Sequence, residues 1–191
     1  MVHAPGPVNQ TSVKFWGAWP DSVYTWKQST NQWAKISGIE NALEIAAGKI
    51  AGGTVDDLVG VWSSGMWVQV ASSGQWLKLS SSNWKKIDAA IPVWITTGDM
   101  TGDKRADIIG SYTSGTWYRN SVTGAWSKIT TPATQLTAGD IDNDNDGRDD
   151  LIGIWADGVW MRYGATGKWQ KISSTKPVWV TTGRTSDYRP R

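Results

Sequence analysis

The sequence predicts an all-β fold in which one short unit of antiparallel strands is used four times. Two observations indicate this: the 191 residues include 15 Trp and 21 Gly but a single Phe, and the same landmarks recur along the chain. Such a density of large aromatic residues is typical of a structural unit that is used repeatedly. Within each unit, apolar and polar residues alternate with period two and are cut by Ser-Gly, Thr-Gly and Asp-Gly turns, which predicts strands.

Three segments of the chain begin with an aspartate, two apolar residues and a glycine. They are Asp57–Trp62, Asp107–Tyr112 and Asp150–Trp155, and each is followed by two Gly-x-Trp segments. The offsets between the copies are 50 and 43 residues for all three landmarks. The longer offset comes from an insertion, SSSN, followed by a second Trp-Lys-Lys-Ile segment at residues 84–87. Constant offsets over three landmarks indicate true repeats.

The strands can be placed in order along the chain. The N-terminal copy is degraded, with strands expected at 13–19, 23–28 and 33–36, and its Trp26-Lys-Gln28 aligns with the Trp-x-[Gln/Arg] of the other copies. Residues 41–48, NALEIAAG, fit a helical turn by themselves, but their alignment with VWITTG at 93–98 favours a strand. The third unit then continues with strands at 107–112, 116–120 and 126–130.

Four short antiparallel strands repeated about every 40–50 residues are typical of a β-propeller blade. We expect a leader at residues 1–10 and one propeller domain at 11–191, with units 11–39 plus 178–191, 40–90, 91–132 and 133–177. Strand one of the N-terminal unit is missing, and residues 178–183 match it, so the two ends are expected to complete one blade and remove a free sheet edge. The result is a closed four-bladed ring or part of a larger propeller formed by association. A β-sandwich is the main alternative, but it would not require fourfold repetition.

Charge and composition exclude several classes of protein. The formal net charge is +2, which gives no electrostatic reason for nucleic acid or an anionic membrane as partner. No run of 18 apolar residues is present to span a bilayer, and the absence of cysteine excludes disulfides and thiolate chemistry. The first ten residues, MVHAPGPVNQ, lack the basic and apolar regions of a signal peptide.

The stretch DNDNDGRDD at residues 142–150 has the pattern D-x-D-x-D-G-x-x-D, placed between the first and second strands of its unit. Calcium takes about six to eight oxygen ligands, and carboxylates so close together repel one another unless a cation neutralises them. We expect Ca²⁺ to be bound there, with water, by Asp142, Asp144, Asp146, Asp150 and the backbone carbonyl of Arg148.

A second loop, residues 99–107, keeps similar spacing, with Lys104 where the glycine stands in the first loop. Its expected ligands are Asp99, Thr101, Asp103 and Asp107. Lys49 and Arg184 replace Asp99 in the other two copies, so those copies are expected to lack the metal. The alternative for both acidic loops is a solvated turn without an ion.

Each unit also places a tryptophan and a forked hydrogen-bond donor on the same face of one strand, because side chains two residues apart share a face. A flat aromatic ring beside such a donor suits a sugar, whose CH groups stack on indole while its hydroxyls bond the donor. The alternative is that Arg or Lys stems simply cover the indoles at the surface between blades. The candidate ligand-binding residues are Trp67, Gln69, Trp76, Trp117, Arg119, Trp126, Trp160, Arg162 and Trp169.

The segments GDMTGDKRADIIG and DIDNDNDGRDDLIGIW resemble FG-GAP or VCBS repeats of integrin-α-like propellers. The following GVWMRYGATGKW is similar to the Trp-rich blades of propeller lectins such as the Psathyrella velutina lectin family. The resemblance covers residues 40–183 and, more weakly, 13–39. It implies a propeller fold, calcium in the hairpins between strands one and two, and carbohydrate binding in shallow pockets between blades. The chain departs from it in its decayed calcium loops and in having about four units instead of the usual seven.

Two functions follow from these residues, and a third class, an enzyme, is the least supported. The first is a carbohydrate-binding propeller, lectin-like or adhesin-like, which binds glycans or glycoproteins outside the cell or at its surface. The second is a calcium-stabilised structural or protein-interaction scaffold without a sugar ligand, including self-association into a larger ring. An enzyme is not expected, since no G-x-S-x-G or P-loop pattern exists and the only glutamates are Glu40 and Glu44.

Overall fold

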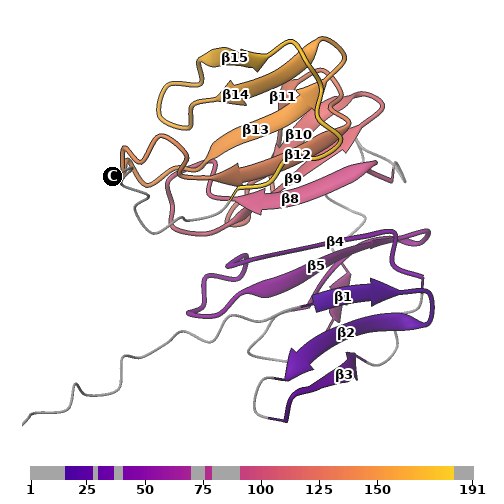
Figure 1. Cartoon of the computed structure of the whole chain (residues 1–191). Coiled ribbons are helices and arrows are strands. Elements are labelled where there is room, and N and C mark those ends of the chain that lie inside the picture. The colour runs from indigo at the N-terminus through magenta and orange to yellow at the C-terminus, as the bar shows by residue number, and fades with distance from the viewer. Residues whose placement is uncertain (1–15, 28–29, 37–40, 70–75, 79–90, 183–191) are drawn as a thin grey trace, which may run out of the picture. The chain divides into compact units, whose positions relative to one another are not determined.

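The computed structural model describes residues 16–27, 30–36, 41–69, 76–78 and 91–182. All regular elements among these residues are β-strands (Figure 1). The expected leader at residues 1–10 lies outside the described residues. The chain divides into two compact units, Met1–Ala42 and Leu43–Arg191. No helix in the described ranges is long and apolar enough to cross a membrane.

The first unit holds one antiparallel sheet of three strands, ordered β1-β2-β3. Its strands are β1 (Trp16–Trp19), β2 (Ser22–Lys27) and β3 (Gln32–Ile36).

The second unit holds three antiparallel sheets of four strands, each ordered as the strands follow in the chain. The first sheet consists of β4 (Glu44–Gly48), β5 (Asp57–Trp62), β6 (Gly65–Gln69) and β7 (Trp76–Lys78). The second consists of β8 (Trp94–Gly98), β9 (Asp107–Tyr112), β10 (Gly115–Arg119) and β11 (Trp126–Thr130). The third consists of β12 (Gln135–Gly139), β13 (Asp150–Trp155), β14 (Gly158–Arg162) and β15 (Trp169–Ser173). The prediction of repeated blade-like sheets is therefore confirmed, and residues 44–48 are a strand.

The strand register is the same in the three sheets of the second unit. The glycine that ends the first strand lies opposite the aspartate that begins the second, as in the pairs Gly48–Asp57, Gly98–Asp107 and Gly139–Asp150. The landmarks read from the sequence are thus structurally equivalent positions, and the fold is β-propeller-like.

The register of the first unit corrects one part of the sequence alignment. Tyr24 lies opposite Gly17, as Trp160 lies opposite Gly153. Trp26 instead lies opposite Trp33, as Arg162 lies opposite Trp169. The alignment of Trp26 with Trp67, Trp117 and Trp160 is therefore wrong by two residues, because it ignored the position of the glycine on the preceding strand.

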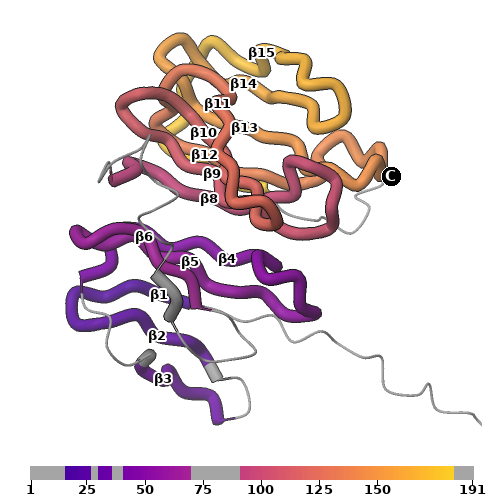
Figure 2. Tube along the Cα trace, turned by 180° about the vertical axis from the view of Figure 1, so that it is seen from behind, coloured from indigo at the N-terminus to yellow at the C-terminus, as the bar shows by residue number. Residues whose placement is uncertain are grey.

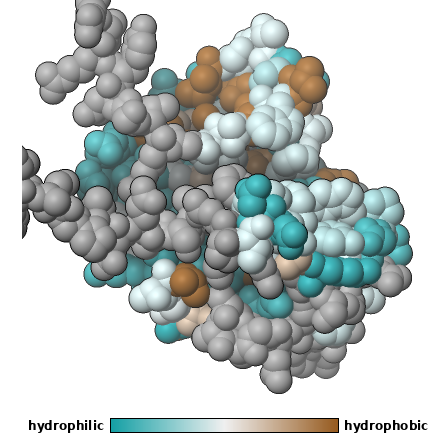
Figure 3. Space-filling view, turned by 60° about the horizontal axis from the view of Figure 1, so that its bottom comes forward, coloured by the Kyte–Doolittle hydropathy of each residue, from teal (hydrophilic) through white to brown (hydrophobic). Residues whose placement is uncertain are grey.

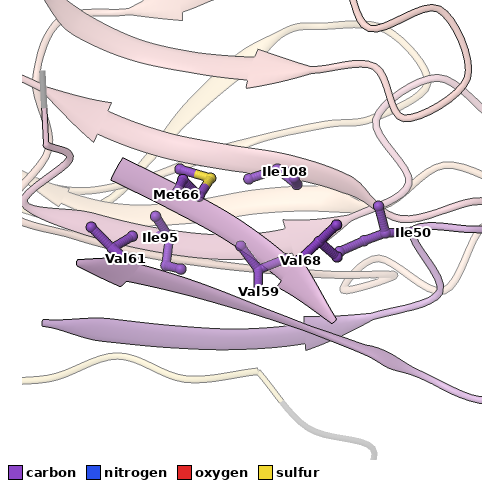
Figure 4. Packing of buried hydrophobic residues seen from close by; sticks show 7 residues of the cluster. All are labelled: Ile50, Val59, Val61, Met66, Val68, Ile95 and Ile108. Atoms are coloured by element: carbon purple, nitrogen blue, oxygen red, sulfur yellow. The ribbon is translucent and has the colours of Figure 1, made fainter. Parts of the chain in front are cut away.

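Two hydrophobic clusters join the sheets of the second unit. One packs Ile50 and residues of β5 and β6 against Ile95 and Ile108 (Figure 4). The other packs Met100 and Ile109 against Leu136, Leu151 and the ring of Trp155. Both faces of the β8–β11 sheet are therefore covered, which is the packing expected of a blade between two neighbours.

The first strands of these sheets lie beside one another, β8 between β4 and β12. Figures 1 and 2 show β8 and β12 close together in the second unit, seen from opposite sides. The Thr97 hydroxyl donates a hydrogen bond to the carbonyl of Ala47, and Trp94 Nε1 donates to the carbonyl of Leu136 at 2.8 Å. Hydrogen bonds between side chains and backbone thus fix the spacing of successive sheets.

Residues 178–182 lie along β12 in the same way. The Thr182 hydroxyl donates to the Ala138 carbonyl at 2.8 Å, as Thr97 does to Ala47, and the Val180 amide donates to Gln135 Oε1 at 2.5 Å. This segment therefore occupies the place of a first strand, as its sequence indicated. In the described residues the β1–β3 sheet has three strands, so completion of that sheet by residues 178–183, and closure of a ring, stay predictions.

A glycine lies beneath an aromatic ring two residues later in each sheet, in β1 of the first unit and in the second strand of the three other sheets. A Cβ atom at Gly153 would lie 2.6 Å from Trp155 Cζ3 and 2.8 Å from the carbonyl oxygen of Gln135, so any side chain must displace the ring or the neighbouring strand. The glycine is required by this close approach.

We expect Gly153→Ala to lower the free energy of unfolding by about 1–3 kcal/mol, the usual cost of overpacking. The matched control is Gly53→Ala, where a Cβ would meet nothing closer than 3.9 Å, and it should change stability by less than about 0.5 kcal/mol. Urea unfolding followed by tryptophan fluorescence measures both. Equal effects of the two substitutions would contradict the packing argument.

Candidate functional site

A cluster of three aromatic residues, a turn residue and a lysine is repeated in all four sheets without any gap in spacing. The pattern is G-x-[WY]-x-[DS]-x2-[WY]-x8-W-x-K, beginning at Gly17, Gly60, Gly110 and Gly153. The common strand register brings these residues to the same end of each sheet.

The cluster of the β12–β15 sheet is centred on Asp157, in the turn between β13 and β14. Its Oδ1 atom accepts a hydrogen bond from Trp160 Nε1 at 3.0 Å, and its Oδ2 atom accepts one from Lys171 Nζ at 3.0 Å. The ammonium group also lies 5.3 Å from the centre of the Trp160 ring, within the range of a cation–π contact. The hydrogen bonds from Lys171 and Trp160 lower the pKa of Asp157, so the carboxylate is ionised at neutral pH.

A cavity of about 520 Å³ opens beside this cluster. Trp155 and Trp169 meet edge to face there, with ring centres 5.3 Å apart, and Trp155 Nε1 donates to the carbonyl of Thr131 at 3.1 Å. The lining includes Thr131, Pro132, Trp155, Asp157, Trp160 and Trp169. This volume lies in the range of small-molecule sites. Three indoles make the wall mostly apolar, and Asp157 is the charged residue in it.

The β1–β3 sheet has an equivalent cluster, formed only by residues of that sheet and its turn. Asp21 Oδ2 accepts a hydrogen bond from the Tyr24 hydroxyl at 2.6 Å and lies 3.5 Å from Lys35 Nζ. Trp19 and Trp33 meet edge to face at 5.0 Å. Trp19, Asp21, Tyr24 and Trp33 line a cavity of about 280 Å³. The hydrogen bond from Tyr24 is the main cause that lowers the pKa of Asp21.

The two other sheets have serine at the place of the aspartate. In the β4–β7 sheet, Trp67 Nε1 donates a hydrogen bond to Ser64 Oγ at 3.4 Å. In the β8–β11 sheet, which has Ser114 at this place, Lys128 Nζ lies 5.6 Å from the centre of the Trp117 ring. No carboxylate stands at this place in either sheet.

The structure brings only some of the predicted ligand-binding residues to these cavities. Trp160 and Trp169 line the larger cavity, whereas Arg162 does not and is half-buried opposite Trp169. Arg119 is likewise half-buried, its Nε atom has no hydrogen-bond partner among the described residues, and burial lowers the pKa of its guanidinium group.

The remaining candidates lie in the two serine-bearing sheets. Trp126 meets Tyr112 edge to face at 6.0 Å, and Gln69 lies opposite Trp76 in the β4–β7 sheet. Trp67 and Trp117 belong to the serine clusters described above. The side chain of Trp76 lies outside the described residues.

Sequence reasoning missed Asp157, Trp155, Asp21, Trp19 and Tyr24. Their signal was present in the gapless pattern that begins at each strand-two glycine. The misplaced alignment of Trp26 concealed it, and Asp157 was taken only as part of an Asp-Gly turn.

The acidic loop at residues 140–150 brings three carboxylates together. Oxygen atoms of Asp140, Asp142 and Asp144 lie within 4.8 Å of one another, and all three residues are exposed. Asn143, Asn145 and Gly147 have positive φ angles, and the amides of Asp144 and Asp146 donate to the carboxylates two residues earlier, at 3.1 and 3.0 Å. Partial loss of hydration within the loop raises the pKa of Asp142, and the charges of Asp150, Asp144 and Asp140 add to the rise.

Asp146 and Arg148 continue this chain of turns. The Arg148 amide donates to Asp146 Oδ1 at 2.8 Å, and Asp146 does not join the group of three carboxylates. Asp140, which the sequence pattern omitted, does join it.

Asp150 has a different setting from the other aspartates of the loop. It is buried, its Oδ2 atom accepts the amides of Ile141 and Asp142 at 3.0 and 3.1 Å, and its Oδ1 atom accepts the amide of Gly164 at 2.8 Å. The carboxylate therefore fastens the loop before β13 and the turn after β14.

Asp107 does the same in its own sheet. It accepts the amides of Met100 at 3.1 Å and Ser121 at 2.9 Å, and burial raises its pKa to about 6. Asp57 accepts the amide of Ala51 at 2.7 Å. Because these bonds recur in sheets with and without an acidic loop, the aspartate at this place has a structural role of its own.

In the loop at residues 99–107, backbone amides of the loop donate hydrogen bonds to its first carboxylate. The Asp99 carboxylate accepts the amides of Thr101, Gly102, Asp103 and Lys104 at 2.6–3.3 Å. Asn120 Nδ2 donates to Thr101 Oγ1 at 3.2 Å and to Asp103 Oδ2 at 3.4 Å. These donors already occupy oxygens that the sequence pattern assigned to a metal.

No protein-family profile matches the chain, and no curated protein matches it by sequence. Solved structures with a similar fold include an Agrocybe aegerita lectin that recognises non-reducing terminal N-acetylglucosamine, with a TM-score of 0.53 and 16% identity over 83% of this chain and 49% of the lectin. Another is the extracellular domain described for a hybrid two-component system of B. thetaiotaomicron, with a TM-score of 0.53 and 11% identity over 83% of this chain and 20% of that one. This chain therefore spans at most half the length of these two structures, and the likeness concerns the fold.

We expect Asp150→Asn to destabilise the chain by about 1–3 kcal/mol, because the amide group would face backbone N–H groups and leave at least one buried donor unpaired. The control is Asp146→Asn, an exposed position, which should cost less than about 0.5 kcal/mol. Urea unfolding in EDTA compares the two without any contribution from a metal. A cost at Asp150 no larger than that at Asp146 would refute the structural role.

Proposed function

We propose that the chain is a carbohydrate-binding propeller domain and that its sugar site is the cavity beside Asp157. The observation that carries the proposal is a cavity walled by three indoles and the carboxylate of Asp157, which accepts a hydrogen bond from the ammonium group of Lys171 at 3.0 Å. Sugar rings present apolar CH faces and polar edges, so an aromatic wall beside a paired donor and acceptor suits both parts. The lectin-like fold supports this class of ligand.

The polar groups of the site remain available to a ligand. The side chain of Asp157 is 58% exposed and that of Lys171 is 35% exposed. A carboxylate has about four lone-pair positions and an ammonium group three donors, so each keeps bonding capacity beyond its present partners. Hydroxyl groups can therefore bond to both without breaking the ion pair.

The proposed activity is binding and not catalysis. Asp157 is held ionised by its partners, which leaves it a hydrogen-bond acceptor and not an acid. We propose that such a domain acts outside the cell or at its surface, and the extracellular domain among the similar folds supports this location.

A protein-interaction scaffold is the second candidate, supported by one observation. Trp179 is 64% exposed and Val178 is 99% exposed, whereas Trp94 at the equivalent place bonds to the next first strand. A further blade from a partner or a second copy would cover these side chains. On the face seen in Figure 3, hydrophobic residues form separate groups among hydrophilic and intermediate ones.

We also propose that Ca²⁺ binds the loop at residues 140–150. Its exposed carboxylate oxygens are the hard donors that calcium prefers, and their mutual repulsion favours a cation. Asp140, Asp142 and Asp144 would hold the ion, which would supply charge neutralisation and rigidity to the loop.

A glycan array followed by fluorescence titration tests the sugar site. We expect Trp160→Ala to weaken binding of the array's best ligand at the site beside Asp157 at least about tenfold, or about 1.4 kcal/mol. Trp179→Ala is the matched control, because it removes one indole outside the cavity, and it should bind as the wild type does. Absence of glycan binding by the wild type would contradict the proposal and favour the scaffold.

Chelation tests the metal site. Ion binding to the folded loop alone stabilises by about 2.7 kcal/mol at a hundredfold excess over the dissociation constant, so EDTA should lower the melting temperature. Asp144→Ala should lower it similarly and make it insensitive to EDTA. Asp103→Ala should leave the response to EDTA intact. A melting curve unchanged by EDTA would mean that the loop is a solvated turn.

A further inference from the structure

Two of the four sheets have an aspartate at one place of the repeat, and the other two have a serine. The place is the second residue of a turn, which joins β1 to β2 at Asp21 and joins the second and third strands of the other sheets at Ser64, Ser114 and Asp157. The strands on either side keep the same register in all four sheets. The four positions are therefore directly comparable.

Each aspartate contacts an aromatic residue and a lysine at equivalent positions of its sheet. Asp157 accepts the ring donor of Trp160 on the third strand and Lys171 Nζ on the fourth, each at 3.0 Å. Asp21 accepts the ring hydroxyl of Tyr24 at 2.6 Å and lies 3.5 Å from Lys35 Nζ. A cavity opens beside each, of about 520 Å³ and about 280 Å³ respectively.

The fold does not require a carboxylate at this place. The sheets with Ser64 and Ser114 form the same turn with the same pairing of the flanking strands. The side chains of Asp21 and Asp157 are 61% and 58% exposed, and ion pairs at such exposure add little stability. What the aspartate adds is bonding capacity at the mouth of a cavity.

We propose that Asp21 and Asp157 define two equivalent saccharide sites in this chain and that the serine-bearing sheets lack one. The inference rests on the proposed carbohydrate function and deepens it, because it names the residue that decides which sheets bind and the class of sugar bound. Two sites on one chain would also raise avidity for a multivalent glycan.

The charges of the cluster select a neutral sugar with two neighbouring hydroxyl groups. One hydroxyl donates to the free lone pair of the carboxylate, and the other accepts a hydrogen bond from the lysine ammonium group. An anionic sugar gains less, since each lysine is already paired with its aspartate and the carboxylate repels a second negative charge.

Serine variants test the proposal, because serine is the chain's own residue at this place and the turn accepts it. A glycan array that carries neutral, sialylated and uronate-containing glycans is probed with the wild type, Asp21→Ser, Asp157→Ser and the double variant. Calorimetry with the tightest-binding neutral glycan then counts sites. We expect two sites in the wild type, one in each single variant and at least a tenfold loss of affinity in the double variant. The control, Ser64→Ala with Ser114→Ala, should bind as the wild type does.

A gain-of-site variant makes the test independent of lost stability. Ser114→Asp places a carboxylate between Trp117 and Lys128, whose ammonium group already lies 5.6 Å from the ring centre, and it should add a third site. Glycan binding that persists in the double serine variant, an unchanged site count in Ser114→Asp, or a preference for acidic glycans would each overturn the inference while leaving the carbohydrate function standing. A wild-type chain that binds no glycan would overturn the proposed function itself.

Discussion

The rest of the structure depends on one buried carboxylate in each sheet of the second unit. Asp57, Asp107 and Asp150 begin the second strand and accept amide groups of the loop that precedes it. In the last two sheets the second oxygen accepts an amide from the turn between strands three and four. A single side chain therefore fixes where strand one ends, where strand two begins and where the outer hairpin turns, and a buried carboxylate that lost these donors would be costly.

The buried aspartate also sets the positions of the residues that follow it in the blade. Three residues after Asp150 comes Gly153, whose missing side chain admits the Trp155 ring, and two residues after that ring comes the turn with Asp157. The opposite strand presents Trp160 to Gly153 because the antiparallel register is fixed by the short turn. The cluster around Asp157 is thus placed by the same strand register that builds the core, which explains why its spacing is free of gaps in all four sheets.

Much of the fold could be read from the sequence, because repetition converts weak local signals into a strong one. The strands at 107–112 and 126–130 have the bounds that the sequence predicts. The alignment of the repeats alone predicts the strand within NALEIAAG. The site was harder. Residues of the same type have different environments in the fold. Asp150 and Asp144 belong to one acidic run, yet Asp150 is buried among backbone amides and Asp144 is exposed. Such a difference depends on side-chain direction, which a spacing pattern does not contain.

The division between a constant core and a variable turn explains how one blade can hold two chemistries. The strand-two glycine and the aromatic ring above it are enclosed by neighbouring strands, so a substitution there costs packing energy. The turn residue two positions later points to solvent, with Asp157 more than half exposed, so aspartate and serine fit equally well. Repeats under such constraints diverge first where burial is lowest. A functional difference between sheets is therefore expected at the turn, and the aspartate–serine alternation is found there while the register around it stays the same.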